Sequence, residues 1–314
     1  MNYNFSETTF PSHDGKNTVY ACLYTPKFCT AKGIVQLVHG MVDYVERYEP
    51  LAEFLTGEGY IVAGNHHLGH GKTAASEADL GFFGEESCVD ILVRDIHTMN
   101  RYLRDMFPAL PLVIFGHSMG SFLTRLYIEK YPHSIKGAVI HGTSGPVGAV
   151  GMGKLLASLM IKTKGRRHRS KMLKNIAFSG YNSHFPKSEG NNAWLTRDTE
   201  AIKGHDEDPF SNFTFTVSAY RDLFTMLQSC NRKEWFSEYP KSLPTLVVSG
   251  DEDPVGKYGK GPMYVYKHLL ISGCEKLTLK IYSGARHELF LETNRQEVYA
   301  DLLLWLKENI NTTI

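Results

Sequence analysis

The sequence LVIFGHSMGSFLTRLYI, residues 112–128, decides the fold of this chain. It opens with an apolar run typical of a buried strand, and from Phe122 onward its apolar residues have helical spacing. Between the two stands a Gly-x-Ser-x-Gly motif centred on Ser118. A strand, this motif and a helix in succession indicate a nucleophile elbow, a sharp turn that exposes the serine hydroxyl. The two glycines relieve the collisions that so sharp a turn would otherwise cause.

A serine hydroxyl becomes a nucleophile only with a base and an orienting acid, which in such sites follow in the order serine, acid, histidine. Two further apolar runs, LVVSG and LTLKIY, predict buried strands. Asp251 and Asp253 follow the first, and His287 follows the second. The two aspartates and the histidine each lie just past the carboxyl end of a predicted strand, where open α/β sheets place their sites. On these residues alone either aspartate could orient His287, because the other could simply cap the turn.

Acyl transfer also requires hydrogen-bond donors for the oxyanion. The residue after the nucleophile supplies one backbone N–H, here that of Met119. The second donor comes from the loop after an earlier strand, and the run GIVQLVHGM, residues 33–41, offers the N–H of Met41. Gly40 would let this loop bend toward the substrate. We therefore predict an oxyanion hole formed by Met41 and Met119.

Several stretches resemble the α/β-hydrolase family of monoacylglycerol lipases and bacterial lysophospholipases, also described as serine aminopeptidase-like. HGMVDYVERY (39–48) is similar to the family's H-G-x-x-E-H-x-x-R-Y, and NHHLGHGKT (65–73) is similar to N-D-H-R-G-H-G-x-[ST]. WLTRD (194–198) and GARHE (284–288) also match, so the likeness extends over nearly the whole chain. In this family the acid lies three residues after the glycine that ends strand seven. The resemblance therefore implies Asp253 rather than Asp251.

The sequence departs from the family pattern in two places. His66-His67-Leu68 replaces the usual Asp-His-Arg, and Asp43-Tyr44 replaces Glu-His beside the oxyanion loop. The first change concerns loop bracing, so the activity class should survive. The second bears on the shape of the acyl pocket and hence on the substrate.

The order of apolar runs predicts an α/β protein. A hairpin over residues 5–26 precedes alternating strands and helices, and this rhythm favours a mostly parallel sheet with helices on both faces. We expect an α/β-hydrolase fold with a helical cap inserted after strand six. The predicted core comprises residues 1–145 and 241–314, and the cap comprises residues 146–240. Both ends of this insertion lie at the same sheet edge, so the cap should cover the nucleophile.

The first half of the cap is basic and partly apolar. No Asp or Glu occurs from Lys130 through Ser188, and LLASLMI (155–161) precedes a run of six cations, namely Lys162, Lys164, Arg166, Arg167, Arg169 and Lys171. An apolar face with a basic flank suits transient contact with an anionic membrane surface. The alternative is an ordinary solvated lid loop. A nucleic-acid partner is not expected, because the run lacks interleaved aromatic residues.

Composition fits a globular enzyme. The chain has 314 residues, 42% hydrophobic and 21% charged, with a net charge of +1. Its five cysteines are scattered and the N-terminus has no signal-peptide pattern, so we expect reduced thiols and a cytoplasmic location. His66, His67 and His70 lack metal-ligand spacing. No metal or cofactor is expected.

These observations predict a serine hydrolase acting on a small, lipid-like ester, such as a monoacylglycerol or lysophospholipid. Three alternatives stay open. An aminopeptidase would need an acidic group for the substrate ammonium, which Asp206, Glu207 or Asp208 could supply. A carboxylesterase for non-lipid esters would use the same residues as the lipase. A ligand-binding receptor could keep the fold without turnover.

Overall fold

A single eight-stranded sheet forms the centre of the computed structural model, which describes residues 1–310. The strand order is β1-β2-β4-β3-β5-β6-β7-β8. β1 and β2 form the predicted hairpin, β2 pairs antiparallel with β4, and every later pairing is parallel. The strands are β1 Tyr3–Pro11, β2 Thr18–Pro26, β3 Gly33–Val38, β4 Tyr60–Asn65, β5 Leu112–His117, β6 Gly137–His141, β7 Thr245–Gly250 and β8 Leu277–Tyr282. The predicted mostly parallel sheet is confirmed.

Helices cover both faces of this sheet, and each face has its own apolar core. One core includes residues of α2, α3 and α9, and the other includes residues of α1 and α10. These helices are α1 Glu49–Gly57, α2 Val89–Met106, α3 Met119–Lys130, α9 Lys260–Ile271 and α10 Arg295–Asn309. The inner strands β3 to β7 are buried along their whole length, as continuous apolar runs flanked on both sides require.

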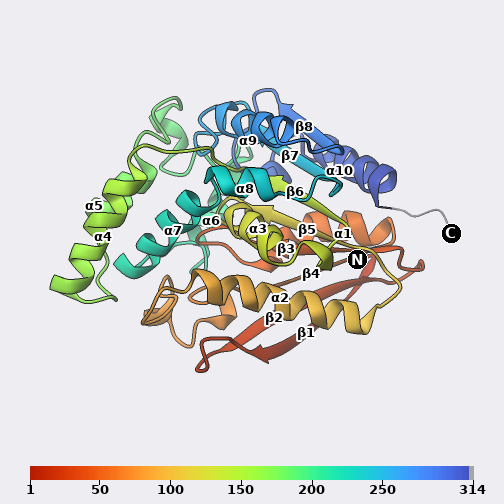
Figure 1. Cartoon of the computed structure of the whole chain (residues 1–314), viewed down its shortest axis with the longest axis horizontal. Helices are drawn as coiled ribbons and strands as arrows, with labels where there is room; N and C mark the ends of the chain where they lie inside the picture. Colours follow the sequence, from red (N-terminus) through yellow and green to blue (C-terminus); the bar gives the residue numbers. More distant parts are fainter. Residues whose placement is uncertain (311–314) are drawn as a thin grey trace.

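The insertion between β6 and β7 is helical in the part of the chain that the structure describes. It contains α4 Val150–Lys164, α5 Lys171–Phe178, α6 Thr199–Glu207, α7 Val217–Ser229 and α8 Lys233–Glu238. α7 packs on both α3 and α4, while α4 and α5 extend away from the sheet at the left of Figure 1. The division into core and cap at residues 145 and 240 stays a prediction.

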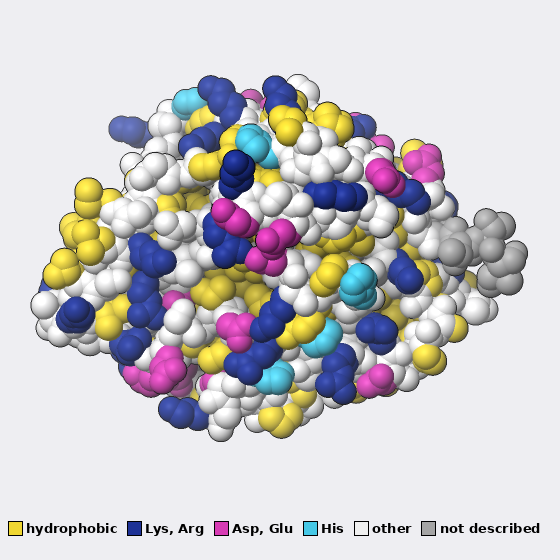
Figure 2. Space-filling model, viewed as in Figure 1, with side chains coloured by type: hydrophobic (Ala, Val, Ile, Leu, Met, Phe, Trp, Pro, Cys, Tyr) yellow, Lys and Arg dark blue, Asp and Glu magenta, His cyan; other side chains and the backbone are white. Residues whose placement is uncertain are grey.

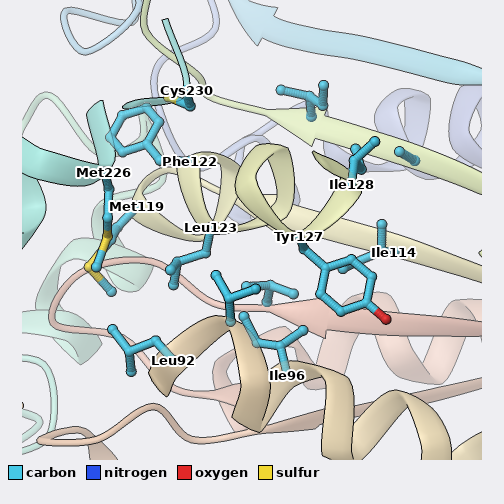
Figure 3. Packing of buried hydrophobic residues seen from close by; sticks show 14 of the residues in the cluster. Leu92, Ile96, Ile114, Met119, Phe122, Leu123, Tyr127, Ile128, Met226 and Cys230 are labelled. Atoms are coloured by element: carbon cyan, nitrogen blue, oxygen red, sulfur yellow. The ribbon is translucent and has the colours of Figure 1, made fainter. Parts of the chain in front are cut away.

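Helix α3 is held from several sides, which matters because it begins directly after Ser118. Figure 3 shows Leu123 and Tyr127 of α3 facing Leu92 and Ile96 of α2, and all four are buried. Burying side chains of this size stabilises a fold by about 1.5–3 kcal/mol each. This packing fixes α3 against α2.

Seven histidines are buried near the carboxyl ends of the strands, and five of them, His39, His67, His70, His117 and His141, have strongly lowered pKa values. Burial and neighbouring histidines hold the pKa of His39 and His117 well below the usual value. Burial likewise lowers the pKa of His67, His70 and His141 to about 3. Hydrogen bonds agree with neutral rings, because His39 Nε2 accepts the N–H of His67 (3.0 Å).

No helix in residues 1–310 is long and apolar enough to span a bilayer. All five cysteines are free thiols.

We expect the fold to lose stability as the pH falls from 7 to 5. The five histidines stay neutral in the folded state but take up protons near pH 6.5 when unfolded, so protons favour the unfolded chain. Each such group costs up to about 1.4 kcal/mol per pH unit in this window. Urea unfolding across this range measures the effect, and replacing the exposed His133 by Gln should leave the slope unchanged. A constant free energy of unfolding between pH 7 and 5 would contradict this account.

Candidate active site

Ser118 lies at the sharp turn between β5 and α3, with φ 52° and ψ −120°. This left-handed backbone is unusual for a residue with a side chain. A Cβ at Gly116 would lie 2.2 Å from Thr124 Oγ1, and one at Gly120 would lie 1.9 Å from Val38 O. Neither position tolerates a side chain, so the predicted steric reason for both glycines is confirmed.

Asp253 is the aspartate that contacts His287. Its Oδ1 lies 3.0 Å from His287 Nδ1, and both side chains are buried. The N–H of Val255 (2.9 Å) and the hydroxyl of Ser249 (3.1 Å) also donate to this carboxylate. Burial alone would raise the pKa of Asp253, but His287 and these hydrogen bonds outweigh burial and lower it. The carboxylate is therefore ionised beside the imidazole.

Asp251 has a different position. Its carboxylate accepts the N–H of Gly284 (2.6 Å) at the start of the loop that leads to His287. It is half-buried and braces this loop without contacting the imidazole ring. The structure thus separates the two aspartates that the sequence alone left equivalent.

The ring of His287 is enclosed by neighbours from three segments. A Cβ at Gly142 would lie 3.0 Å from His287 Cε1, so the chain after β6 closely approaches the ring. The rings of His117 and Trp194 lie at centroid distances of 4.7 and 5.1 Å. Trp194 belongs to the predicted cap, whose residues therefore reach the candidate base directly.

The predicted oxyanion loop lies next to the serine. A Cβ at Gly40 would lie 3.3 Å from Ser118 Cβ. Val42 has φ 56°, and its N–H donates to His70 Nε2 (3.2 Å). A β-branched residue in this backbone region is strained, and such strain persists only where the surroundings enforce it. The loop around Met41 is therefore held in one conformation.

Ser118, His287, Met41 and Met119 all line one cavity of about 1030 Å³. Asp253 lies behind His287 and does not line it. The structure therefore brings together all five residues that the sequence singled out. Their catalytic roles stay predictions.

Apolar and polar side chains of different elements line this cavity. The apolar ones come mainly from α3, α4, α5 and α7 and include Phe122, Val150, Ile176, Leu223, Phe224 and Leu227. The polar ones come mainly from the segment between α5 and α6 and include Ser179, Asn182, Ser183, Asn191 and Asn192. A cavity with this lining can bind an acyl chain against its apolar residues and a hydroxylated group against its polar ones.

Of the three acidic residues considered for an ammonium site, only Asp206 lines the cavity. Its carboxylate accepts a hydrogen bond from Asn192 (2.5 Å). Asp208 instead accepts the Tyr44 hydroxyl (2.7 Å) and the N–H of Phe210 (2.8 Å). Glu207 is exposed at the end of α6.

Within residues 1–310 there is no group of three or more His, Cys, Asp and Glu that could hold a metal ion. His66 contacts Glu46 through Nε2 (2.6 Å) and accepts the N–H of Lys72 through Nδ1 (3.0 Å). These contacts connect the loop after β4 to the short helix that precedes α1.

Sequence reasoning missed one buried ionic cluster at the site, formed by Asp43, Arg47 and Glu288. Arg47 donates to Asp43 Oδ1 (3.0 Å) and to both carboxylate oxygens of Glu288 (2.9 and 2.8 Å). The sequence shows that Asp43 and Arg47 are close in the chain and that Glu288 directly follows His287. It does not show that these three residues contact one another, because 241 residues separate Arg47 from Glu288.

Known proteins are similar to this chain over most of its length. The family model described as serine aminopeptidase, S33, matches residues 30–294. A monoacylglycerol lipase of Mycolicibacterium smegmatis is 25% identical, over 97% of this chain and 98% of its own length. A human monoglyceride lipase is 23% identical, over 93% of this chain and 88% of its own length.

Solved structures share the fold. A thermostable carboxyl esterase from Bacillus coagulans, in complex with glycerol, has a TM-score of 0.91 and 29% identity over 97% of this chain and 98% of its own. A Saccharomyces cerevisiae monoglyceride lipase has a TM-score of 0.78 and 19% identity, covering 99% of this chain and 97% of its own. The chain therefore has the α/β-hydrolase fold and belongs to the serine aminopeptidase S33 family of hydrolases, as its motifs predicted.

Proposed function

We propose that this protein is a serine hydrolase that cleaves carboxylic esters of single-acyl lipids, such as monoacylglycerols or lysophospholipids. The observation that carries the proposal is the pairing of buried Asp253 with His287 beside a cavity that Ser118 also lines. Relatives described as monoacylglycerol and monoglyceride lipases support the substrate class. So do the apolar walls of the cavity.

In the proposed reaction, Ser118 Oγ attacks the ester carbonyl carbon while His287 accepts the hydroxyl proton. Asp253 orients the imidazole and stabilises its cationic form. The N–H groups of Met41 and Met119 bind the oxyanion of the tetrahedral intermediate. The carbon–oxygen ester bond then breaks, and His287 gives its proton to the departing alcohol. A water molecule repeats the sequence on the acyl-enzyme and releases the fatty acid.

The walls formed by α4, α5 and α7 are the proposed acyl-chain site. Each methylene group buried there contributes about 0.8 kcal/mol, which corresponds to roughly a fourfold gain in binding. The hydroxyl-rich leaving group would contact the polar segment between α5 and α6. The alternative substrate, an amide with a free ammonium group, would place that group near Asp206, whose carboxylate also accepts a hydrogen bond from Asn192.

A panel of p-nitrophenyl esters of increasing chain length, compared with aminoacyl anilides, tests this function. We expect kcat/KM to rise about threefold to fourfold per methylene until the cavity is filled, with little anilide cleavage. Replacing Ser118 by Ala should lower kcat by roughly 10⁴-fold or more and abolish fluorophosphonate labelling. Faster cleavage of anilides would favour the aminopeptidase, and a flat chain-length profile would favour a non-lipid carboxylesterase. Ligand binding without any turnover would favour the receptor.

Separate replacement of the two aspartates tests the choice of acid. Asp253→Ala should lower kcat by about 10³- to 10⁴-fold, because the imidazole loses both its orientation and its counter-charge. Asp251→Ala is the matched control and should retain kcat within about tenfold, since Asp251 only braces the loop. Kinetics per fluorophosphonate-labelled site separate catalysis from misfolding. The opposite order of effects would refute the assignment of Asp253.

We also propose that α4 and α5 contact an anionic membrane surface. Met152, Leu155, Leu159 and Met172 are 46–63% exposed, and Figure 2 shows hydrophobic side chains at the left edge, where Figure 1 places these helices, with Lys and Arg beside them. The exposed cations include Lys162, Lys164, Lys171 and Lys174. Arg167 and Arg169 are also exposed, but Arg167 pairs with Asp79 (2.8 Å) and Arg169 donates to backbone carbonyls, so part of the basic run has structural partners.

Vesicle co-sedimentation tests this contact. Phosphatidylcholine vesicles that contain phosphatidylglycerol should bind the protein, and the Lys162→Glu/Lys164→Glu variant should bind at least about tenfold less. The matched control is Lys16→Glu/Lys276→Glu, which reverses two exposed lysines elsewhere. Equal loss in both variants, or no dependence on the anionic lipid, would dismiss the proposal.

A further inference from the structure

Arg47 lies between the two loops that carry the proposed oxyanion donor and the proposed general base. It belongs to the short 3-10 helix Val45–Tyr48, and its side chain is only 8% exposed. One branch of the guanidinium is shared between Asp43 and Glu288, and the other binds Glu288 alone. A planar fork of this kind fixes the relative position of two carboxylates, which a flexible lysine cannot do.

On one side, Asp43 connects Arg47 to the oxyanion loop. Its Oδ2 accepts the N–H of Gly40 (3.1 Å) and the hydroxyl of Tyr48 (2.7 Å), while its Oδ1 accepts the N–H of Tyr44 (2.8 Å). The Gly40 peptide directly precedes Met41, whose N–H is the proposed oxyanion donor. The orientation of that donor therefore depends on where Asp43 is held.

On the other side, Glu288 connects Arg47 to the general base, because it directly follows His287. Among the described residues, Arg47 supplies both hydrogen bonds of this carboxylate. The backbone N–H of Glu288 donates to Leu195 O (2.7 Å), which ties the same segment to the predicted cap. Burial would raise the pKa of Glu288, but Arg47 outweighs burial and lowers it. Glu288 is therefore a buried anion that depends on one cation.

The charges of this cluster face the reaction. Asp43 and Glu288 both line the cavity that Ser118 lines, whereas Arg47 does not. Two carboxylates thus border the space in which the tetrahedral intermediate would develop negative charge. Without the guanidinium behind them, they would oppose that charge, since like charges repel most strongly where water is excluded.

We propose that Arg47 is a positioning residue of the hydrolysis: it binds the Met41 loop and the His287 segment to each other and offsets the carboxylate charge that faces the intermediate. This inference rests on the proposed serine hydrolase function. It assigns to a residue outside the triad an effect on kcat rather than on substrate binding.

Three variants separate the two parts of this role. Arg47→Met removes both the planar guanidinium and its positive charge. It should lower kcat by roughly 100-fold and leave KM within about threefold of its original value. Arg47→Lys keeps the charge without the fork and should lose roughly tenfold. Arg47→Met/Glu288→Gln removes one of the two anions left without a cation and should recover about tenfold relative to Arg47→Met, which also guards against a variant that fails to fold.

The affinity for an alkyl boronic acid is the second measurement, because a residue with a merely structural role would not change it. Boronates add to the serine as a tetrahedral anion, so their affinity should fall in Arg47→Met in parallel with kcat/KM. All rates are taken per fluorophosphonate-labelled site. Arg221→Met is the matched control, because it also leaves a buried carboxylate, Asp222, without its cation (3.2 Å). That control should keep kcat and boronate affinity within about threefold of the unmodified protein.

The inference is overturned if Arg47→Met keeps kcat and boronate affinity per labelled site, or if the double variant is no better than Arg47→Met. Failure of the proposed function has a different signature, namely ester cleavage that survives Ser118→Ala. An inactive Ser118→Ala together with a fully active Arg47→Met would refute this inference alone.

Discussion

The close packing of Gly120 against the main chain at the end of β3 is the constraint on which the site depends. A Cβ there would lie 1.9 Å from Val38 O and 2.5 Å from His39 O, so α3 begins in contact with the loop that follows β3. This contact keeps the N-terminus of α3, which directly follows Ser118, next to the loop that carries Met41. The two peptide groups that we propose as oxyanion donors therefore belong to segments that pack on each other.

Buried polar groups hold the remaining parts of the site in place. Asp253 is satisfied by His287, Val255 and Ser249, while the buried cluster of Asp43, Arg47 and Glu288 joins the loops on either side of the serine. Neutral histidine rings fill the edge of the sheet between these ion pairs and accept backbone N–H groups. A buried charge that loses its partner is costly, so these contacts favour one geometry over its alternatives.

Local sequence patterns predicted the features that depend on residues close together in the chain, and the family resemblance predicted which of two aspartates is the acid. The apolar runs that begin at residues 33, 112, 246 and 277 lie on strands β3, β5, β7 and β8, and Gly-x-Ser-x-Gly predicted the elbow. The selection of Asp253 over Asp251 came from the resemblance and not from spacing. Contacts between distant segments were missed. Arg125, for example, is buried without a carboxylate, stacks on Trp235 at 4.4 Å and donates to the carbonyls of Ser144 and Cys230. No sequence period reveals such a contact, because only the folded chain brings these groups together.

The most direct test of the account is a crystal structure of the protein with a long-chain alkyl phosphonate bound covalently to Ser118. The phosphoryl oxygen should lie within hydrogen-bonding distance of the backbone nitrogens of Met41 and Met119, with the alkyl chain among the apolar residues of α4, α5 and α7. His287 should lie between Ser118 and Asp253. A phosphoryl oxygen that contacts neither nitrogen, or an imidazole turned away from the serine, would contradict the account.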